Sequence, residues 1–211
     1  KKVTAIPDAP RKSFCRMSPD ESLATRKRLK VEDDFLLFVG TLEPRKNLLT
    51  LLKAFAKVLR DATCRSQLVV AGGEGWLMEE TFSFITGAGI GDRLRLIGYV
   101  NDDELRALYS SCRAFIYPSL YEGFGLPPLE AMACGAPVIA SRIPALEETI
   151  GDAARLVDPL DVHALVAAIT DVCQNGKLRT KLITAGPIHA ARFSWEKAAR
   201  STYEVYRSVV A

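Results

Sequence analysis

Residues 35–62, FLLFVGTLEPRKNLLTLLKAFAKVLRDA, contain the pattern on which the fold depends. FLLFVG is a short apolar run closed by glycine, which is typical of a strand buried on both faces. Asn47 is then predicted to cap a helix over 48–62, because apolar residues recur there every three or four positions. A buried strand joined to an amphipathic helix by a short polar loop is the repeating unit of a parallel sheet.

The same alternation continues along the chain. Further strands are predicted at 67–72, 93–98, 114–118, 137–141 and 154–158, and helices after Trp76, over 103–112, over 127–134 and, two or three times, near the C-terminus. This order indicates an α/β domain with a doubly wound parallel sheet. Ligands of such folds bind beyond the carboxyl ends of the strands.

Composition and charge exclude several classes of protein. The 211 residues are 48% hydrophobic and 25% charged, unlike a disordered or fibrous chain. No apolar run approaches the roughly 18 residues of a membrane span, and the polar N-terminus is unlike a signal peptide. Residues 1–30 carry a net charge of +6 and the remainder −3, so the basic excess is terminal and we expect no nucleic-acid partner. We expect a cytoplasmic protein, with peripheral association at the inner face of the membrane.

The cysteines and the first 34 residues give two further expectations. Five cysteines, widely spaced and without a CxxC pair, predict reduced thiols and neither a disulfide framework nor a zinc site. Residues 1–34 do not follow the alternation: KVTAIPDAP predicts a short strand with a proline-rich exit, and a basic helical stretch follows it. We therefore divide the chain into a lead-in segment, 1–34, and a folded domain, 35–211.

Two basic residues stand at the first strand–helix loop, TLEPRKN. Amides at a helix N-terminus and the helix dipole favour an anion, and Arg45 and Lys46 add two cations beside them. Arg can grip a phosphate with two hydrogen bonds, and Lys acts as a point charge. Simple solvation of both side chains is the alternative.

The segment YEGFGLPPLEAMACGAPVIAS places two carboxylates eight residues apart around a glycine loop. Gly123 and Gly125 allow backbone amides to approach a ligand, and Glu130 lies about one turn into the next helix. Each carboxylate can accept two hydrogen bonds from a diol, which suits a hydroxyl-rich ligand. Alternatively, Glu122 is a turn residue and Glu130 interacts with the helix dipole. Paired carboxylates also allow glycoside hydrolysis.

Other catalytic signatures are weak or missing. GGEGW contains a fragment of the dinucleotide fingerprint, but Met78 occupies the place of the third glycine. No D-x-D motif occurs, the two histidines are isolated in helical stretches, and there is no G-x-S-x-G elbow. We therefore expect no metal and no bound cofactor.

The motifs GTLEPRKN, GGEGW, LIGYVNDDELRALYSSC and PSLYEGFGLPPLEAMACGAPVIAS resemble the C-terminal domain of the retaining glycosyltransferases of family 4, glycosyltransferase group 1. The resemblance covers nearly the whole chain. It implies the C-terminal half of a GT-B enzyme: a Rossmann-like domain that binds the sugar nucleotide and faces an acceptor domain across a cleft. The acceptor domain is expected before residue 1, so this chain alone is expected to be inactive.

The resemblance also implies residue roles. Glu130 is expected to hold the ribose hydroxyls and Glu122 those of the donor sugar, with Arg45 and Lys46 neutralising the diphosphate. The remaining expected substrate-binding residues lie in three loops: Gly40 and Thr41, then Tyr99 and Val100, which line the base, and finally Gly123, Phe124, Gly125 and Leu126. Many relatives have Gly-Arg after the first strand, whereas this chain has Gly40-Thr41.

The TLEPRKN subtype resembles bacterial polysaccharide mannosyl- and rhamnosyltransferases, which favours GDP-mannose as donor and a glycan or lipid-linked acceptor. Two alternatives stay open: a non-catalytic nucleotide-binding module, and another GT-B-like enzyme such as a sugar-nucleotide epimerase. A protein-interaction scaffold has no need of two glutamates around glycines.

Overall fold

The computed structural model describes residues 3–210, and its centre is a parallel sheet of six strands. The strands are β1 (Phe35–Val39), β2 (Gln67–Ala71), β3 (Leu94–Gly98), β4 (Ala114–Tyr117), β5 (Val138–Ser141) and β6 (Arg155–Val157). Their order across the sheet is β3-β2-β1-β4-β5-β6. The six strands predicted from residue 35 onward are present, each within one residue of its predicted bounds, and the doubly wound parallel sheet is confirmed.

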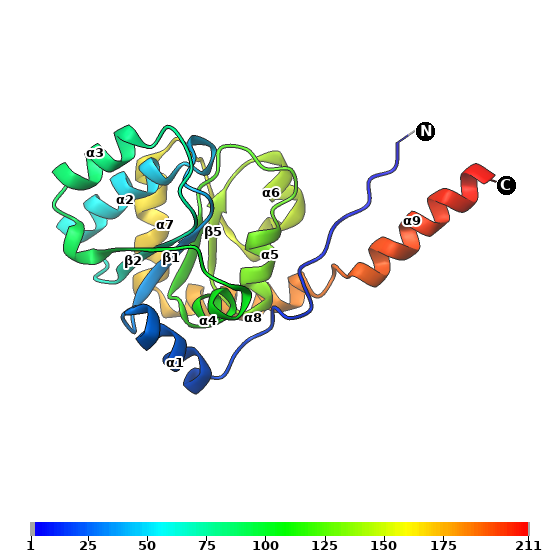
Figure 1. The fold of residues 1–211 in the computed structure, drawn as a ribbon, viewed down its shortest axis with the longest axis horizontal. Coiled ribbons are helices and arrows are strands. Elements are labelled where there is room, and N and C mark those ends of the chain that lie inside the picture. Colours follow the sequence, from blue (N-terminus) through cyan, green and yellow to red (C-terminus); the bar gives the residue numbers. More distant parts are fainter. Residues whose placement is uncertain (1–2, 211) are drawn as a thin grey trace.

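Helices cover both faces of the sheet (Figure 1). In chain order the α-helices of the described residues are α1 (Pro19–Leu29), α2 (Leu48–Arg60), α3 (Glu79–Gly87), α4 (Asp102–Ser111), α5 (Leu126–Ala133), α6 (Pro144–Thr149), α7 (Val162–Gln174), α8 (Gly176–Ala190) and α9 (Trp195–Val210). On one face α2 packs against α3 and α7; on the other, α4 packs against α1 and α5.

Alternation along each strand divides the core into two layers. In β1, Phe35 and Leu37 join the cluster that includes residues of α4 and α5, whereas Leu36 and Phe38 join the cluster that includes residues of α2 and α7. Successive strand side chains point to opposite faces, so a strand covered on both sides has to be apolar throughout. This is why FLLFV lacks the polar alternation of a half-exposed strand.

Two local predictions are wrong. Over residues 3–10 the chain has no regular secondary structure, so the strand predicted in KVTAIPDAP does not form. Asn47 precedes α2 but does not cap it with its side chain, because its backbone is left-handed, with φ of 57°. The side-chain Nδ2 of Asn47 instead donates to the carbonyl oxygens of Pro118 (2.9 Å) and Pro159 (2.8 Å).

The prediction that all cysteines are reduced thiols is also wrong. Cys64 and Cys173 form a disulfide between the loop after α2 and the C-terminal end of α7. The pair could not be predicted from the sequence, because the two cysteines are separated by 109 positions although their Cα atoms lie 5.8 Å apart in the fold. The disulfide removes the cysteine-based argument for a cytoplasmic location.

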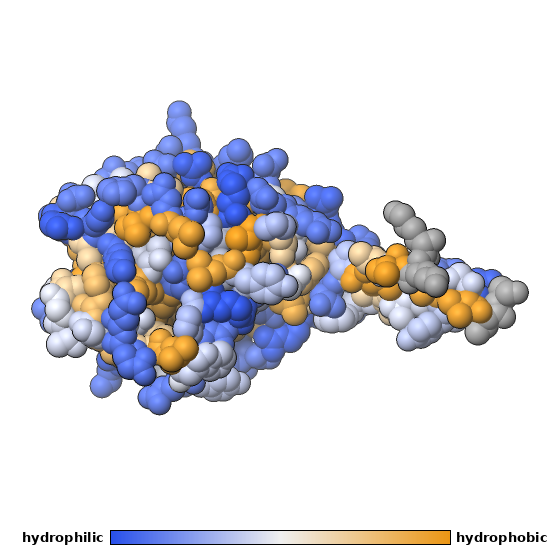
Figure 2. Space-filling view, turned by 90° about the horizontal axis from the view of Figure 1, so that it is seen from above, coloured by the Kyte–Doolittle hydropathy of each residue, from blue (hydrophilic) through white to orange (hydrophobic). Residues whose placement is uncertain are grey.

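The C-terminal helix projects from the domain. In both views α9 extends away from the sheet (Figures 1 and 2), and Trp195, Tyr203, Tyr206 and Val209 are exposed along it. The lead-in segment contacts its beginning, where Lys12 forms an ion pair with Glu196. None of the helices within residues 3–210 combines the length and apolar character that a membrane crossing requires.

Candidate functional site

The predicted site loops meet where the order of the strands reverses. Chain connections run in opposite directions from β1 and β4, and the crevice between their carboxyl ends is the usual ligand site of such sheets. Two hydrogen bonds tie these loops together: Leu120 N donates to Arg45 O (2.8 Å), and the Asn47 side chain donates to Pro118 O. The sheet therefore positions both loops against each other.

Three side chains from these loops and one from the end of β4 form one hydrogen-bonded group, which we call the switch-point cluster: Arg45, Lys46, Tyr117 and Glu122. Lys46 Nζ donates to Glu122 Oε1 and to the Tyr117 hydroxyl, both at 2.7 Å. Tyr117 donates to the same Oε1 (2.8 Å), and Arg45 Nη1 lies 3.0 Å from it. Lys46 also lies over the Tyr117 ring, 4.8 Å from its centroid.

These contacts fix the charge of Glu122. Burial raises the pKa of Glu122, but hydrogen bonds from Lys46 and Tyr117 outweigh it, so the pKa lies below its ordinary value of 4.5. Burial also raises the pKa of the Tyr117 hydroxyl, which stays protonated and able to donate. Glu122 is therefore a carboxylate held ionised by its neighbours.

Glu43, a buried residue of the same loop, holds the other predicted cation in place. Its Oε1 accepts from Arg45 Nη2 at 2.5 Å, and Arg45 Nη1 donates to Tyr121 O at 3.0 Å. The Arg45 side chain is nevertheless 41% exposed. A guanidinium has five N–H donors and an ammonium has three, so both cations keep donors for a ligand oxygen.

The loop between Glu122 and α5 requires a glycine at one position. Gly125 has φ of 100°, and a Cβ there would overlap the Leu146 side chain. At Gly123, by contrast, a Cβ would have no neighbour within 4 Å, so this position faces open space. The Phe124 side chain packs edge-on against Phe193.

Glu130, one turn into α5, belongs to a separate group that we call the Glu130 cluster: Arg11, Asp102 and Glu130. Arg11 Nε donates to Glu130 Oε1 (3.1 Å), and Arg11 Nη1 contacts Asp102 Oδ2 (2.5 Å). The Glu130 side chain is only 8% exposed. Burial raises its pKa above the ordinary value, and the hydrogen bond from Arg11 opposes this without cancelling it.

The remaining predicted residues follow the carboxyl ends of β1, β3 and β4. Gly40, directly after β1, lies against Gly72, directly after β2, so that a Cβ on Gly72 would overlap the carbonyl oxygen of Gly40. The loops that follow β1 and β2 are therefore packed tightly together. Thr41 is the second residue after β1, and Leu126 is the first residue of α5. After β3, Tyr99 is 82% exposed, whereas Val100 is buried in the core.

The structure thus brings Arg45, Lys46 and Glu122 together and places Glu130 in a different group. Sequence reasoning missed three contacting residues. Tyr117 ends a strand at the carboxyl edge, and Glu43 lies inside the quoted loop motif, so both carried a positional signal. Arg11 had none, because it belongs to a segment assigned to a lead-in.

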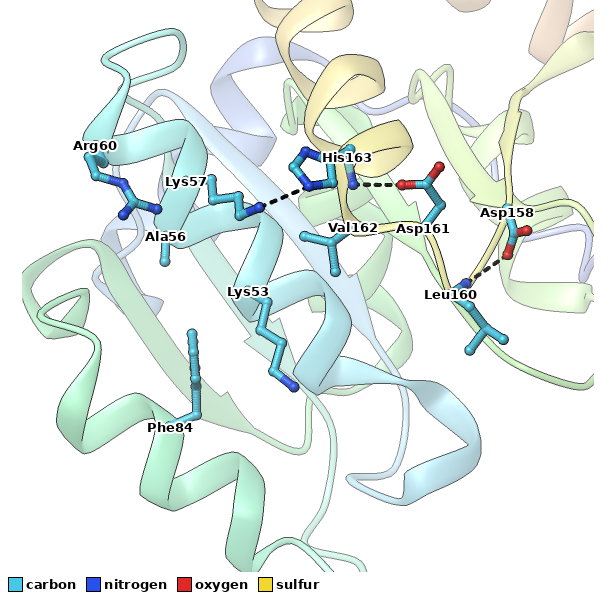
Figure 3. A pocket seen from close by; sticks show the side chains of 10 residues that line it. All are labelled: Lys53, Ala56, Lys57, Arg60, Phe84, Asp158, Leu160, Asp161, Val162 and His163. Carbon is cyan, nitrogen blue, oxygen red and sulfur yellow. Dashed lines mark hydrogen bonds between the residues drawn. The ribbon is translucent and has the colours of Figure 1, made fainter.

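A cavity of about 710 Å³ contains none of these residues (Figure 3). It lies along α2 and reaches α3 and the start of α7, and in Figure 3 the Lys57 ammonium points at His163, 3.3 Å from Nε2. Its two carboxylates are engaged by backbone amides, Asp158 with Leu160 and Asp161 with the first turn of α7. No group of three or more potential metal ligands occurs in the described part of the chain.

Comparisons with known proteins agree with this architecture. The chain is 37% identical over 191 residues to O-antigen chain mannosyltransferase B of Escherichia coli. The matched region covers 90% of this chain and 50% of that protein. It superposes on sucrose-phosphate synthase from Thermosynechococcus elongatus with a TM-score of 0.84 at 28% identity, over 97% of this chain and 52% of the other. The chain therefore spans about half the length of both proteins.

A third match is to a solved single domain and covers most of both chains. The C-terminal domain of a glycosyl transferase group 1 family protein from Francisella tularensis matches with a TM-score of 0.73 at 22% identity, over 85% of this chain and 94% of that domain. The fold is that of the C-terminal half of GT-B glycosyltransferases. The profile of the family described as "Glycosyl transferases group 1" matches residues 20–189, and this chain belongs to that family.

Proposed function

We propose that this chain is the donor-binding domain of a retaining glycosyltransferase that transfers mannose from GDP-mannose to a glycan or lipid-linked acceptor in polysaccharide synthesis. The observation that carries the proposal is the switch-point cluster, which gathers two cations and a carboxylate in the crevice where the strand order reverses. The name of the E. coli relative, a mannosyltransferase, supports the choice of sugar.

The donor occupies this crevice with its two ends at different clusters. Arg45 and Lys46 face the diphosphate and offset the charge that develops on it as the bond to the sugar breaks. Glu122 accepts hydrogen bonds from hydroxyls of the sugar, next to the glycine loop of residues 123–126. Glu130 accepts from the ribose diol, and the backbone around Tyr99 lines the base.

The acceptor and its binding residues belong to the part of the enzyme outside this chain, which spans about half of its relatives. Residues 35–211 form the donor-binding domain, and the lead-in segment connects it with the acceptor domain. Transfer therefore requires the whole enzyme, while nucleotide binding requires only the surface described above. Retention of configuration in the product, followed by NMR with the whole enzyme, separates a transferase from a binding module or an epimerase.

Calorimetric titration of this chain with GDP, UDP and ADP tests the nucleotide site. We expect GDP to bind, and Glu130→Ala to weaken it by about 1.5–3 kcal/mol, the value of hydrogen bonds to a charged group. Glu148→Ala is the matched control, since Glu148 is an exposed glutamate on α6. Unchanged GDP affinity in Glu130→Ala contradicts the ribose assignment, and EDTA is expected to leave the affinity unchanged.

A further inference from the structure

Resting on the proposed function, we propose that Arg11 is a positioning residue of the donor site: it holds one oxygen of Glu130 and so presents the other to the ribose of a ribonucleoside diphosphate. Arg11 Nε donates to Oε1 of Glu130. Within residues 3–210, Oε2 receives no hydrogen bond. A carboxylate fixed through one oxygen loses little further freedom when a diol binds the other.

Three contacts hold the Arg11 guanidinium in one place. It bridges Glu130 on α5 and Asp102 at the start of α4, and it lies over the Phe14 ring, 4.6 Å from the centroid. These contacts come from three different parts of the chain. Its side chain is nevertheless 48% exposed, so it lies at the surface and not in the core.

The backbone around Arg11 is anchored as well. Ala9 and Phe14 on either side of it are buried, and Phe14 packs against Tyr109 with ring centroids 6.0 Å apart. Phe14 N donates to Arg11 O at 2.9 Å, which closes a turn at Arg11. The segment assigned to a lead-in therefore seats a side chain on the donor-binding surface.

The charges around Glu130 make this contact matter for binding. In the described residues, four titratable groups face Glu130: Arg11 from the lead-in segment, Asp102 and Tyr109 from α4, and Cys134 after α5. Arg11 is the one cation among these four groups. Burial raises the pKa of Glu130 and Arg11 lowers it. Arg11 thus favours the ionised carboxylate, which accepts hydrogen bonds from the ribose hydroxyls at full strength, over the acid, which has fewer acceptor sites.

The test compares Arg11→Ala and Arg11→Lys with Lys12→Ala, using calorimetry with GDP and 2′-deoxy-GDP between pH 5.5 and 8. We expect Arg11→Ala to weaken GDP binding about tenfold, somewhat less than direct loss of a charged hydrogen bond. We also expect it to lower the preference for GDP over 2′-deoxy-GDP and to move the acid loss of affinity to higher pH. Lys12, which pairs with Glu196, is the control and should change nothing.

Arg11→Lys separates charge from geometry. A lysine keeps the positive charge but cannot bridge two carboxylates with a planar fork, so we expect an effect of about threefold, between wild type and Arg11→Ala. A purely structural role for Arg11 would lower thermal stability but leave both the deoxy preference and the pH profile in place. That result overturns the inference.

Other outcomes assign failure to one proposal or the other. If Glu130→Ala weakens GDP binding and Arg11→Ala does not, the inference fails and the proposed function stands. Tighter binding in Arg11→Ala also overturns it, since Arg11 would then block the carboxylate. If Glu130→Ala has no effect, the ribose assignment fails and the inference with it.

A measurement without nucleotide checks the electrostatics directly. In a ¹³C-labelled protein, the side-chain carboxyl of Glu130 should titrate at higher pH in Arg11→Ala than in wild type, with Arg11→Lys between them. Identical titration in all three proteins overturns the inference, because Arg11 would then not act on this carboxylate.

Discussion

The side chains of the two glutamates of the YEGFGLPPLEA element are only 10% and 8% exposed, yet their pKa values are shifted in opposite directions. Glu122 receives hydrogen bonds from a lysine and a tyrosine and lies 3.0 Å from an arginine, and its pKa is lowered. Glu130 has one guanidinium at one oxygen and Asp102 nearby, and its pKa is raised. Eight residues of sequence therefore separate a locked anion from one that is only partly compensated.

The two carboxylates differ in how many hydrogen bonds they already accept from the protein, and therefore in how many they can accept from a ligand. Three donors converge on Oε1 of Glu122, so its carboxylate is part of the rigid structure that positions Lys46. Glu130 keeps more of its capacity to accept hydrogen bonds, which suits a group whose partner arrives with the ligand. The switch-point cluster holds its charged groups in fixed positions, whereas the Glu130 cluster leaves its carboxylate able to exchange hydrogen-bond partners when a ligand binds.

Lys46→Ala should give the largest effect, because it removes the central donor of the locked cluster. We expect the free energy of unfolding to fall by about 3 kcal/mol, the lower end for breaking a buried ion pair, since Arg45 still faces Glu122. We also expect the preference for GDP over guanosine to fall, since the diphosphate loses one of its two cations and keeps Arg45. Urea denaturation and calorimetry measure the two effects.

Lys53→Ala is the control for Lys46→Ala, because Lys53 is a more exposed lysine, 3.6 Å from Glu80. It should change stability by less than about 0.5 kcal/mol, as surface pairs do. A Lys46→Ala protein as stable as this control would mean that the switch-point cluster is not locked. An undiminished preference for GDP over guanosine would refute the diphosphate role of Lys46.

Tyr117→Phe is the next test of the locked cluster. It removes only the hydroxyl that links Lys46 to Glu122, so we expect a loss of about 1.5 kcal/mol in the free energy of unfolding. Tyr109→Phe is a closely matched control: its hydroxyl is fully buried and has no hydrogen-bond partner among the described residues. That change should be neutral or stabilising. Equal losses in both variants would show that the hydrogen bonds of the Tyr117 hydroxyl do not stabilise the fold.

Sequence reasoning located the strands and the loop residues because local patterns encode them. FLLFV has to be apolar throughout if helices cover both faces, and polar residues at the ends of strands have to gather at one edge of a parallel sheet. Arg45, Lys46 and Glu122 follow from these two rules and the motifs. The family resemblance supplied the roles that the rules could not.

Contacts between distant segments could not be predicted in this way. Arg11 lies 119 residues before Glu130, and Cys64 lies 109 residues before Cys173, with no local pattern at either end. The sequence predicts that Asn47 caps α2, but its backbone is left-handed and its side chain donates to two carbonyl groups that are distant in the sequence. In each case tertiary packing decided the partner, and a single sequence records only the residue.

The pH dependence of stability should give the smallest effect and the sharpest contrast between the two glutamates. Glu122→Gln and Glu130→Gln each remove one titration, so the difference in unfolding free energy between wild type and variant isolates that group. Denaturation by urea at closely spaced pH values between 3 and 7 measures it for both variants.

Because the pKa of Glu122 lies below 4.5 in the folded protein, its ionised form stabilises the fold above pH 4.5, and this contribution is lost as pH falls through the folded pKa. The pKa of Glu130 lies above 4.5, so the folded protein holds that proton more tightly, and wild type should lose stability relative to Glu130→Gln as pH rises from 4.5 through the folded pKa. The two difference curves should therefore slope in opposite directions, on opposite sides of pH 4.5. Curves of the same sign would mean that the two carboxylates share one environment, and the distinction between a positioning and an exchanging glutamate would fail.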